Sequence, residues 1–236
     1  MCQLCIASPS RRGFLHGAVA AAAALALPSA AWSAEAPAAP DAIGPDEALQ
    51  RLVDGNARYA ANTATNKDYS AGRVARSLGQ YPFATIISCA DSRVAPEILF
   101  DQGPGELFVI RVAGNFVNED GLASIEYGSA VLGVPLILVL GHSSCGAVDA
   151  TIKAVQKGTR LPGHLPSLVA AIRPAVKEAI AAKPADLLAE ATIYNVRHNV
   201  EKLRKAKPII AKAVAEGKVK LAGGVYDIAT GKVTMV

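Results

Sequence analysis

The sequence contains few aromatic residues and no run of Lys and Arg interleaved with aromatic side chains. Aromatic residues make up 5% of the 236 residues, and the formal net charge is only +4 at pH 7. Proteins that bind nucleic acids usually carry a basic stripe with side chains on which bases can stack. The composition therefore argues against a nucleic-acid partner. With 51% hydrophobic and 19% charged residues, the chain instead has the composition of a globular protein with one sizeable core.

Long apolar runs are also missing. The most apolar segment, Gly17 to Leu27, is too short to span a bilayer comfortably, so we expect no stable membrane span. It follows Arg11 and Arg12 and precedes the small residues around Ala34-Glu35-Ala36, the order of an export signal with a cleavage site. The arginine pair resembles a twin-arginine signal, which exports folded proteins into the periplasm. A general secretory signal that happens to contain two arginines is the alternative.

This interpretation divides the chain into three parts. We expect residues 1–36 to be an export signal peptide, recognised in the precursor by the twin-arginine export machinery. Residues 37–44 are expected to be a linker, and residues 45–236 a single domain located in the periplasm. The sequence contains no internal repeat and no indication of a second domain.

Cysteine is scarce as well. The chain has 4 cysteines, and because Cys2 and Cys5 fall in the expected signal, the mature protein would keep only Cys89 and Cys145. A Cys-x-x-Cys pair is missing from the mature part, which argues against a thiol–disulfide exchange protein. In an oxidising compartment, one disulfide is the simplest structural role for the two cysteines. A metal site is the competing interpretation, and metal loaded before export would protect both thiolates from oxidation.

Short apolar runs alternate with helical patterns over most of the mature chain. Such alternation is typical of a mainly parallel sheet covered by helices on both faces. We therefore predict an α/β fold with about four parallel strands and a C-terminal edge strand, the last pair forming a hairpin around Thr230-Gly231. The expected strands are 83–87, 107–110, 135–140, 218–226 and 233–236, and the expected helices are 45–62, 74–78, 95–100, 121–132, 166–182, 187–205 and 208–216.

Two short motifs carry residues that can bind a metal ion. Cys89 ends one predicted strand, and His142 directly follows another. Neighbouring parallel strands end at the same edge of a sheet, so the two side chains should lie close together. The spacing of His142 and Cys145 predicts that both lie on one side of a single helical turn. Two thiolates and one imidazole form a three-ligand zinc set that leaves a fourth position open, as in catalytic zinc sites.

The motif Cys89-x-Asp91-x-Arg93, together with His142-x-x-Cys145, resembles the β-class carbonic anhydrases. The resemblance implies one zinc ion per chain, held by the two cysteines and the histidine, and a catalytic pair formed by Asp91 and Arg93. An ordinary ion pair that caps a turn is the alternative for these two residues. Further matching segments, spread over nearly all of the mature chain, are Asp54–Tyr59, Gly105–Arg111, Ser124–Tyr127 and Tyr226–Gly231.

The same resemblance implies partners and further site residues. It implies a homodimer or homotetramer with the active site at the subunit interface. Gln102 and Gly146 are the candidate substrate-binding residues, although the spacing around Gln102 differs slightly from that of the family.

The implied activity is the zinc-dependent, reversible hydration of carbon dioxide to bicarbonate and a proton, by attack of zinc-bound hydroxide. Asp91 would orient the hydroxide or, as a fourth ligand, close the site. Arg93 would keep the Asp91 carboxylate ionised and turned away from the metal. A carbonyl sulfide or carbon disulfide hydrolase on the same scaffold and a catalytically silent zinc-binding protein remain the alternatives.

Overall fold

The computed structural model describes residues 42–66, 68–70 and 72–236, all within the unit Glu35–Val236. The expected export signal and most of the expected linker lie outside the described residues. The strands are β1 (Ala84–Ser88), β2 (Leu107–Arg111), β3 (Leu136–His142), β4 (Lys220–Tyr226) and β5 (Val233–Met235). The helices are α2 (Pro45–Ala60), α3 (Arg73–Arg76), α4 (Pro96–Leu99), α5 (Glu119–Ala130), α6 (Gly146–Lys157), α7 (Leu165–Ala182), α8 (Leu187–Arg204) and α9 (Ile209–Ala215).

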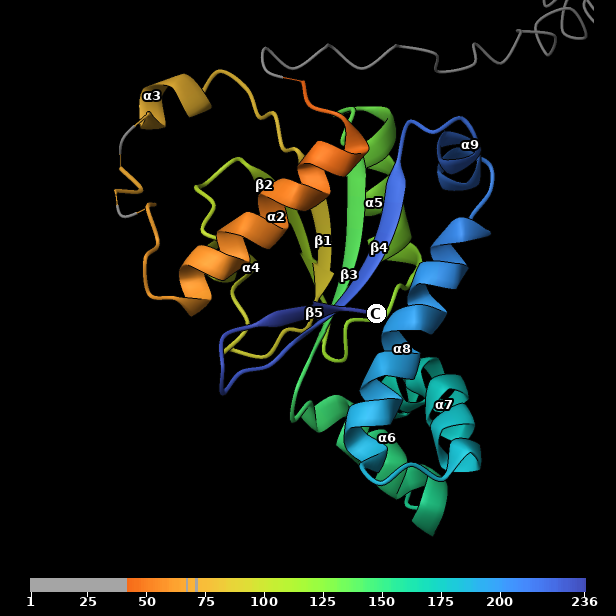
Figure 1. The fold of residues 1–236 in the computed structure, drawn as a ribbon. Helices are drawn as coiled ribbons and strands as arrows, with labels where there is room; N and C mark the ends of the chain where they lie inside the picture. The colour runs from red at the N-terminus through yellow and green to blue at the C-terminus, as the bar shows by residue number, and fades with distance from the viewer. Residues whose placement is uncertain (1–41, 67, 71) are drawn as a thin grey trace, which may run out of the picture. The chain divides into compact units, whose positions relative to one another are not determined.

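The strands form one five-stranded sheet in the order β2-β1-β3-β4-β5 (Figure 1). The first four strands pair in parallel, and β5 runs antiparallel to β4 at the edge. Every residue of β1 and β3 is buried, as their continuous apolar sequences require of central parallel strands. The predicted α/β fold, with four parallel strands and a C-terminal edge strand, is confirmed.

Alternate residues of the central strands face different groups of helices. Ile86 and Leu138 belong to a cluster with residues of α2 and α4, whereas Ile87 and Val139 belong to a cluster with residues of α5, α8 and α9. Figure 1 shows α2 in front of the sheet and α5 behind it. Successive side chains of a strand point to opposite faces, so both faces of the sheet are covered.

Helices α6 and α7 pack together beyond the carboxyl ends of the strands, and α8 extends from them along the sheet. Helix α7 contacts both α6 and α8, α8 also contacts β3 and β4, and Figure 1 shows α6 and α7 below the arrowheads of β1 and β3. The Asp186 side chain accepts a hydrogen bond from the Ala189 N–H and so begins α8. The sequence patterns predicted α7 and α8 to within a residue at each end but missed α6.

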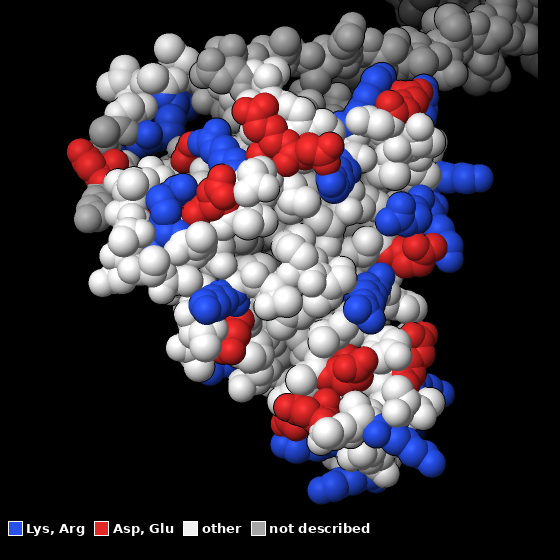
Figure 2. Space-filling view, in the orientation of Figure 1, with Lys and Arg blue, Asp and Glu red and all other residues white. Residues whose placement is uncertain are grey.

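One surface area lacks charged side chains. Figure 2 shows it at the centre of the viewed face, over β5. Val53 and Ala57 of α2 and Val233 and Met235 of β5 border a pocket there, and 42% of Val53 and 39% of Met235 are exposed. We call these four residues the α2–β5 patch. No helix in the described part of the chain is both long and apolar enough to span a membrane.

Asp101, which follows α4, is hydrogen-bonded to α2 and to the segment after it. Its buried carboxylate accepts hydrogen bonds from Arg58 Nε (2.6 Å) and from the backbone N–H groups of Thr65 (3.0 Å) and Asn66 (2.9 Å). Burial alone would raise the pKa of Asp101, but the Arg58 guanidinium and these N–H groups outweigh burial and hold the pKa below its ordinary value. Ionised Asp101 therefore stabilises the folded protein.

We expect Asp101→Asn to lower the free energy of unfolding at pH 7 by about 1.5–3 kcal/mol, because hydrogen bonds to a charged acceptor are lost. A depressed folded-state pKa stabilises above the unfolded pKa, near 3.9 for Asp, and this contribution is lost at lower pH. The gap between wild type and variant should therefore begin to narrow below about pH 4 and shrink further as the pH falls toward the folded-state pKa. Urea unfolding measured across this pH range checks the prediction.

Asp149→Asn is the matched control, because it removes an exposed carboxylate paired with Lys153 within α6. It should change the free energy of unfolding by no more than about 0.5 kcal/mol. Equal effects of the two substitutions would contradict the role given to Asp101.

Candidate metal centre

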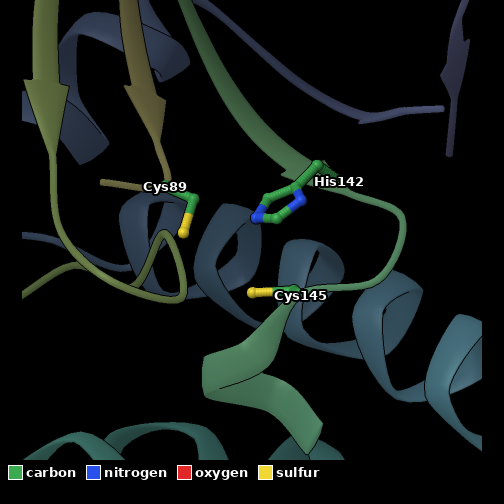
Figure 3. A group of neighbouring side chains, drawn as sticks. All are labelled: Cys89, His142 and Cys145. Atoms are coloured by element: carbon green, nitrogen blue, oxygen red, sulfur yellow. The ribbon is translucent and has the colours of Figure 1, made fainter. Parts of the chain in front are cut away.

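Three ligand-type residues meet where strands end and a helix begins. Cys89 directly follows β1, and His142 is the last residue of β3, which pairs directly with β1. Cys145 immediately precedes α6. Figure 3 shows the three side chains pointing toward a common centre. The expected single helical turn holding His142 and Cys145 is wrong, because His142 still belongs to the sheet and a two-residue turn separates it from the residue that begins α6.

The ligand atoms of these residues form a compact buried cluster. One nitrogen and two sulfur atoms all lie within 4.8 Å of one another. His142 and Cys145 are fully buried, and Cys89 is 4% exposed. Both cysteines are free thiols, so the disulfide considered for them is not formed.

The donor set and its hydrogen bonds fit zinc. His142 Nδ1 lies 2.9 Å from the Ser143 carbonyl oxygen, so Nδ1–H donates to this carbonyl and Nε2 keeps its lone pair. Nε2 is buried and has no hydrogen-bond partner among the described residues. A backbone carbonyl that orients the ring is the usual second partner of a zinc-bound histidine. Two thiolates with one imidazole suit zinc, and a single ion per chain satisfies all three donors.

Without metal, the pKa values of the two cysteine thiols are shifted in opposite directions. The Cys145 thiol donates to Cys89 and lowers the pKa of Cys89, and His142 and the Gly114 N–H lower it further against the opposing effect of burial. The hydrogen bond to Cys89, together with burial, raises the pKa of Cys145. Zinc binds cysteine as the thiolate, so metal binding releases protons and zinc affinity should fall with falling pH.

An ion pair borders the cluster on its solvent side. Arg93 Nε and Nη2 donate to the Asp91 carboxylate at 2.9 and 2.8 Å, and the Arg93 backbone N–H adds a third bond at 3.0 Å. Asp91 Oδ2 lies 3.9 Å from His142 Nε2. Hydrogen bonds from Arg93 are the main reason that the pKa of Asp91 lies well below its usual range. An ionised carboxylate therefore faces the ligand cluster but is bound to arginine.

A second arginine, Arg111, shapes this site, although no sequence motif indicated this role. Arg111 Nε donates to the Cys89 carbonyl oxygen (3.0 Å), and Arg111 Nη2 donates to the Asp91 carbonyl oxygen (2.6 Å). The two hydrogen bonds fix the backbone from Cys89 to Asp91, which connects the first metal ligand to the Asp91–Arg93 ion pair. Strand register was the missing signal, because Arg111 of β2 pairs with Ser88 of β1.

The two candidate substrate-binding residues lie in different surroundings. Gly146 is exposed as the first residue of α6, and a Cβ atom built on it would meet nothing within 4 Å. Gln102 is buried; its Nε2 donates to the Phe100 carbonyl (2.8 Å), and its Oε1 accepts from Arg51 Nε (3.2 Å). These bonds of Gln102 lead toward α2 and α4 rather than to the ligand cluster. Substrate contact by either residue stays a prediction.

Sequence comparison identifies the family. The family description "Carbonic anhydrase" matches residues 84–233, which include all three ligands. The chain belongs to the carbonic anhydrase family. A carbonic anhydrase of Mycolicibacterium smegmatis is 39% identical over 194 residues, covering 81% of this chain and 93% of the relative. A carbonic anhydrase of Pseudomonas aeruginosa is 42% identical over 202 residues, covering 78% of this chain and 86% of the relative.

Solved structures assign the chain to the β class. A Coccomyxa β-carbonic anhydrase in complex with acetazolamide is 31% identical, with a TM-score of 0.63, and the match covers 80% of this chain and 86% of that one. A tetrameric β-carbonic anhydrase of Sordaria macrospora shares the fold at 24% identity, with a TM-score of 0.65 over 80% of this chain and 97% of that one. The predicted β-class resemblance is confirmed.

We expect Cys145→Ser to reduce the zinc content of this carbonic anhydrase from about one ion per chain to a small fraction, because one of three protein ligands is lost. Zinc in the purified proteins is measured by inductively coupled plasma mass spectrometry.

Thr151→Val is the matched control. It removes a buried hydroxyl from α6 that bonds only to the Ala147 carbonyl of the same helix and offers no metal ligand. Equal zinc content in Cys145→Ser and this control would contradict the assignment.

Proposed function

We propose that the protein catalyses the reversible hydration of carbon dioxide to bicarbonate and a proton. The observation that carries the proposal is the ionised Asp91 carboxylate, bound to Arg93 and 3.9 Å from the ligand atom of His142. A purely structural zinc site has no need of a carboxylate held beside its ligands. The relatives named carbonic anhydrase support the same reaction.

Cys89, His142 and Cys145 would hold the zinc ion. Bound zinc lowers the pKa of a water molecule from about 16 to about 7 and so supplies hydroxide near neutral pH. Three protein ligands leave the fourth position open for this chemistry.

Asp91 and Arg93 would control the attacking group. The Asp91 carboxylate can accept a hydrogen bond from the attacking hydroxyl and orient its lone pair toward carbon dioxide. Arg93 binds both carboxylate oxygens of Asp91, which keeps the carboxylate ionised and competes with its binding to the metal. The geometry supports an arrangement in which the fourth metal position is open.

The substrate would reach the centre from the solvent side. Carbon dioxide is small and uncharged, so it needs space rather than a charged binding pocket. The exposed Gly146 beside Cys145 leaves such space, which supports the role proposed for it. Arg93 is also exposed and can attract the bicarbonate product.

We also propose that the protein is a homodimer or homotetramer. The α2–β5 patch is uncharged and partly apolar (Figure 2), as subunit interfaces often are. The related Sordaria macrospora enzyme is described as tetrameric. The family resemblance implies that the active site lies at the interface between subunits.

The sequence supports export to the periplasm. We propose that residues 1–36 form a twin-arginine signal, that residues 37–44 are a linker, and that residues 45–236 form the single catalytic domain. Export in the folded state would let zinc bind the thiolates before they meet an oxidising compartment.

Stopped-flow carbon dioxide hydration by purified protein of measured zinc content tests the function. We expect hydration that requires about one zinc per chain and exceeds the hydrolysis of carbonyl sulfide or carbon disulfide. Full zinc content without hydration would overturn the proposal, and faster hydrolysis of a sulfur compound would favour the hydrolase alternative.

Arg93→Ala should lower the hydration rate about 10- to 100-fold without loss of zinc, because the released Asp91 carboxylate competes for the open position. Arg204→Ala is the control, since it removes a similarly exposed arginine paired with Glu201 on α8 and should leave the rate unchanged. Unchanged hydration in Arg93→Ala would contradict the role of the ion pair.

A further inference from the structure

The proposed mechanism leaves unused a row of polar residues on α8. Asn195, Asn199 and Lys202 follow one another at spacings of four and three residues, which places them on one face of the helix. Asn195 is 1% exposed and Asn199 is 3% exposed. Buried amides cost free energy unless they are hydrogen-bonded, so their partners indicate their role.

All three side chains bind the loop that follows β2. Asn195 Nδ2 donates to the Gly114 carbonyl oxygen (2.8 Å). Asn199 Oδ1 accepts from the Val117 N–H (2.9 Å), and Lys202 Nζ donates to the Val117 carbonyl oxygen (2.7 Å). Helix α8 thus fixes both ends of the loop segment 114–117.

The same loop contacts a metal ligand. The Gly114 N–H donates to Cys89 Sγ at 3.2 Å, and Figure 3 shows the loop after β2 curling beside Cys89. Gly114 has φ +84°, and a Cβ atom here would lie 2.5 Å from Ile172 Cδ1 and 3.2 Å from Ala147 Cβ. A side chain at this position would be strained, so the residue must be glycine. Glycine has no side chain to fix its backbone, so the direction of this N–H depends on the hydrogen bonds that other residues make to the loop.

Gly114 therefore links Asn195 to Cys89, because its carbonyl oxygen accepts from Asn195 and its N–H donates to the Cys89 sulfur. We propose that Asn195 is a positioning residue of the metal centre: it holds Gly114 so that the Gly114 N–H donates to the Cys89 sulfur. A hydrogen bond to a metal-bound thiolate fixes the direction of the sulfur and withdraws electron density from it, so zinc keeps more of its positive charge. Asn199 and Lys202 secure the far end of the loop.

The solvent side and the protein side of Cys89 are thus held by different groups. Arg111 binds the backbone carbonyl oxygen of Cys89, whereas the α8 row acts on its sulfur through Gly114. The inference rests on the proposed function only in that Cys89 is a zinc ligand, and its readouts do not require turnover.

Asn195→Leu tests the proposal, because leucine keeps a similar volume but cannot donate to Gly114. We expect the zinc dissociation constant, measured by competition with a chelator, to rise about 10- to 100-fold. In cobalt-substituted protein, we expect the thiolate-to-cobalt charge-transfer absorption to shift. A merely structural role would lower the melting temperature but leave this absorption unchanged.

Thr192→Val is the matched control on the same helix. Its buried hydroxyl bonds only to the Leu188 carbonyl within α8, so its loss should change neither the spectrum nor the zinc dissociation constant. Folded Asn195→Leu with wild-type values for both would overturn the proposal.

Lys202→Met keeps the test decisive if Asn195→Leu does not fold. Lys202 is exposed, and its replacement removes only the bond to Val117. We expect smaller changes in the same direction, and unchanged values would then overturn the proposal. Absence of carbon dioxide hydration in the wild type would instead overturn the proposed function, since both readouts here report metal binding alone.

Discussion

The direct parallel pairing of β1 with β3 is the constraint on which the metal centre depends. It brings the residue after β1 and the last residue of β3 to one edge of the sheet, although they are far apart in sequence. Every residue of both strands is buried, and alternate residues pack into two different helix clusters, so a slip by one residue would exchange the side chains that the two clusters receive. The fold therefore fixes Cys89 and His142 before any metal binds, and the short turn to α6 adds Cys145.

The centre has a solvent side and a protein side with different tasks. On the solvent side, the partly exposed Arg93 holds Asp91 beside the ligands. On the protein side, α8 holds the loop whose Gly114 N–H reaches Cys89. The Asp91–Arg93 pair thus lies toward solvent. The groups that orient Cys89 lie in the protein interior, where hydrogen bonds are stronger than in water.

Periodicity and short motifs predicted the sheet, most helices and the ligand trio, because burial patterns and ligand types are local in sequence. These patterns did not predict one helix or the roles of two residues. The segment 146–157 was not recognised as α6, which begins only after Cys145, so the histidine lies outside the helical turn on which the spacing had placed it. The roles of Arg111 and Asn195 depend on strand register and on packing between distant segments, which no single-sequence pattern reports.

Zinc K-edge X-ray absorption of the loaded protein tests the central claim most directly, because it reports which atoms surround the ion. We expect two sulfur atoms at about 2.3 Å, one imidazole nitrogen at about 2.0–2.1 Å and one further light atom in the fourth position. A shell without sulfur, or with a single sulfur atom, would contradict a centre built from Cys89, His142 and Cys145.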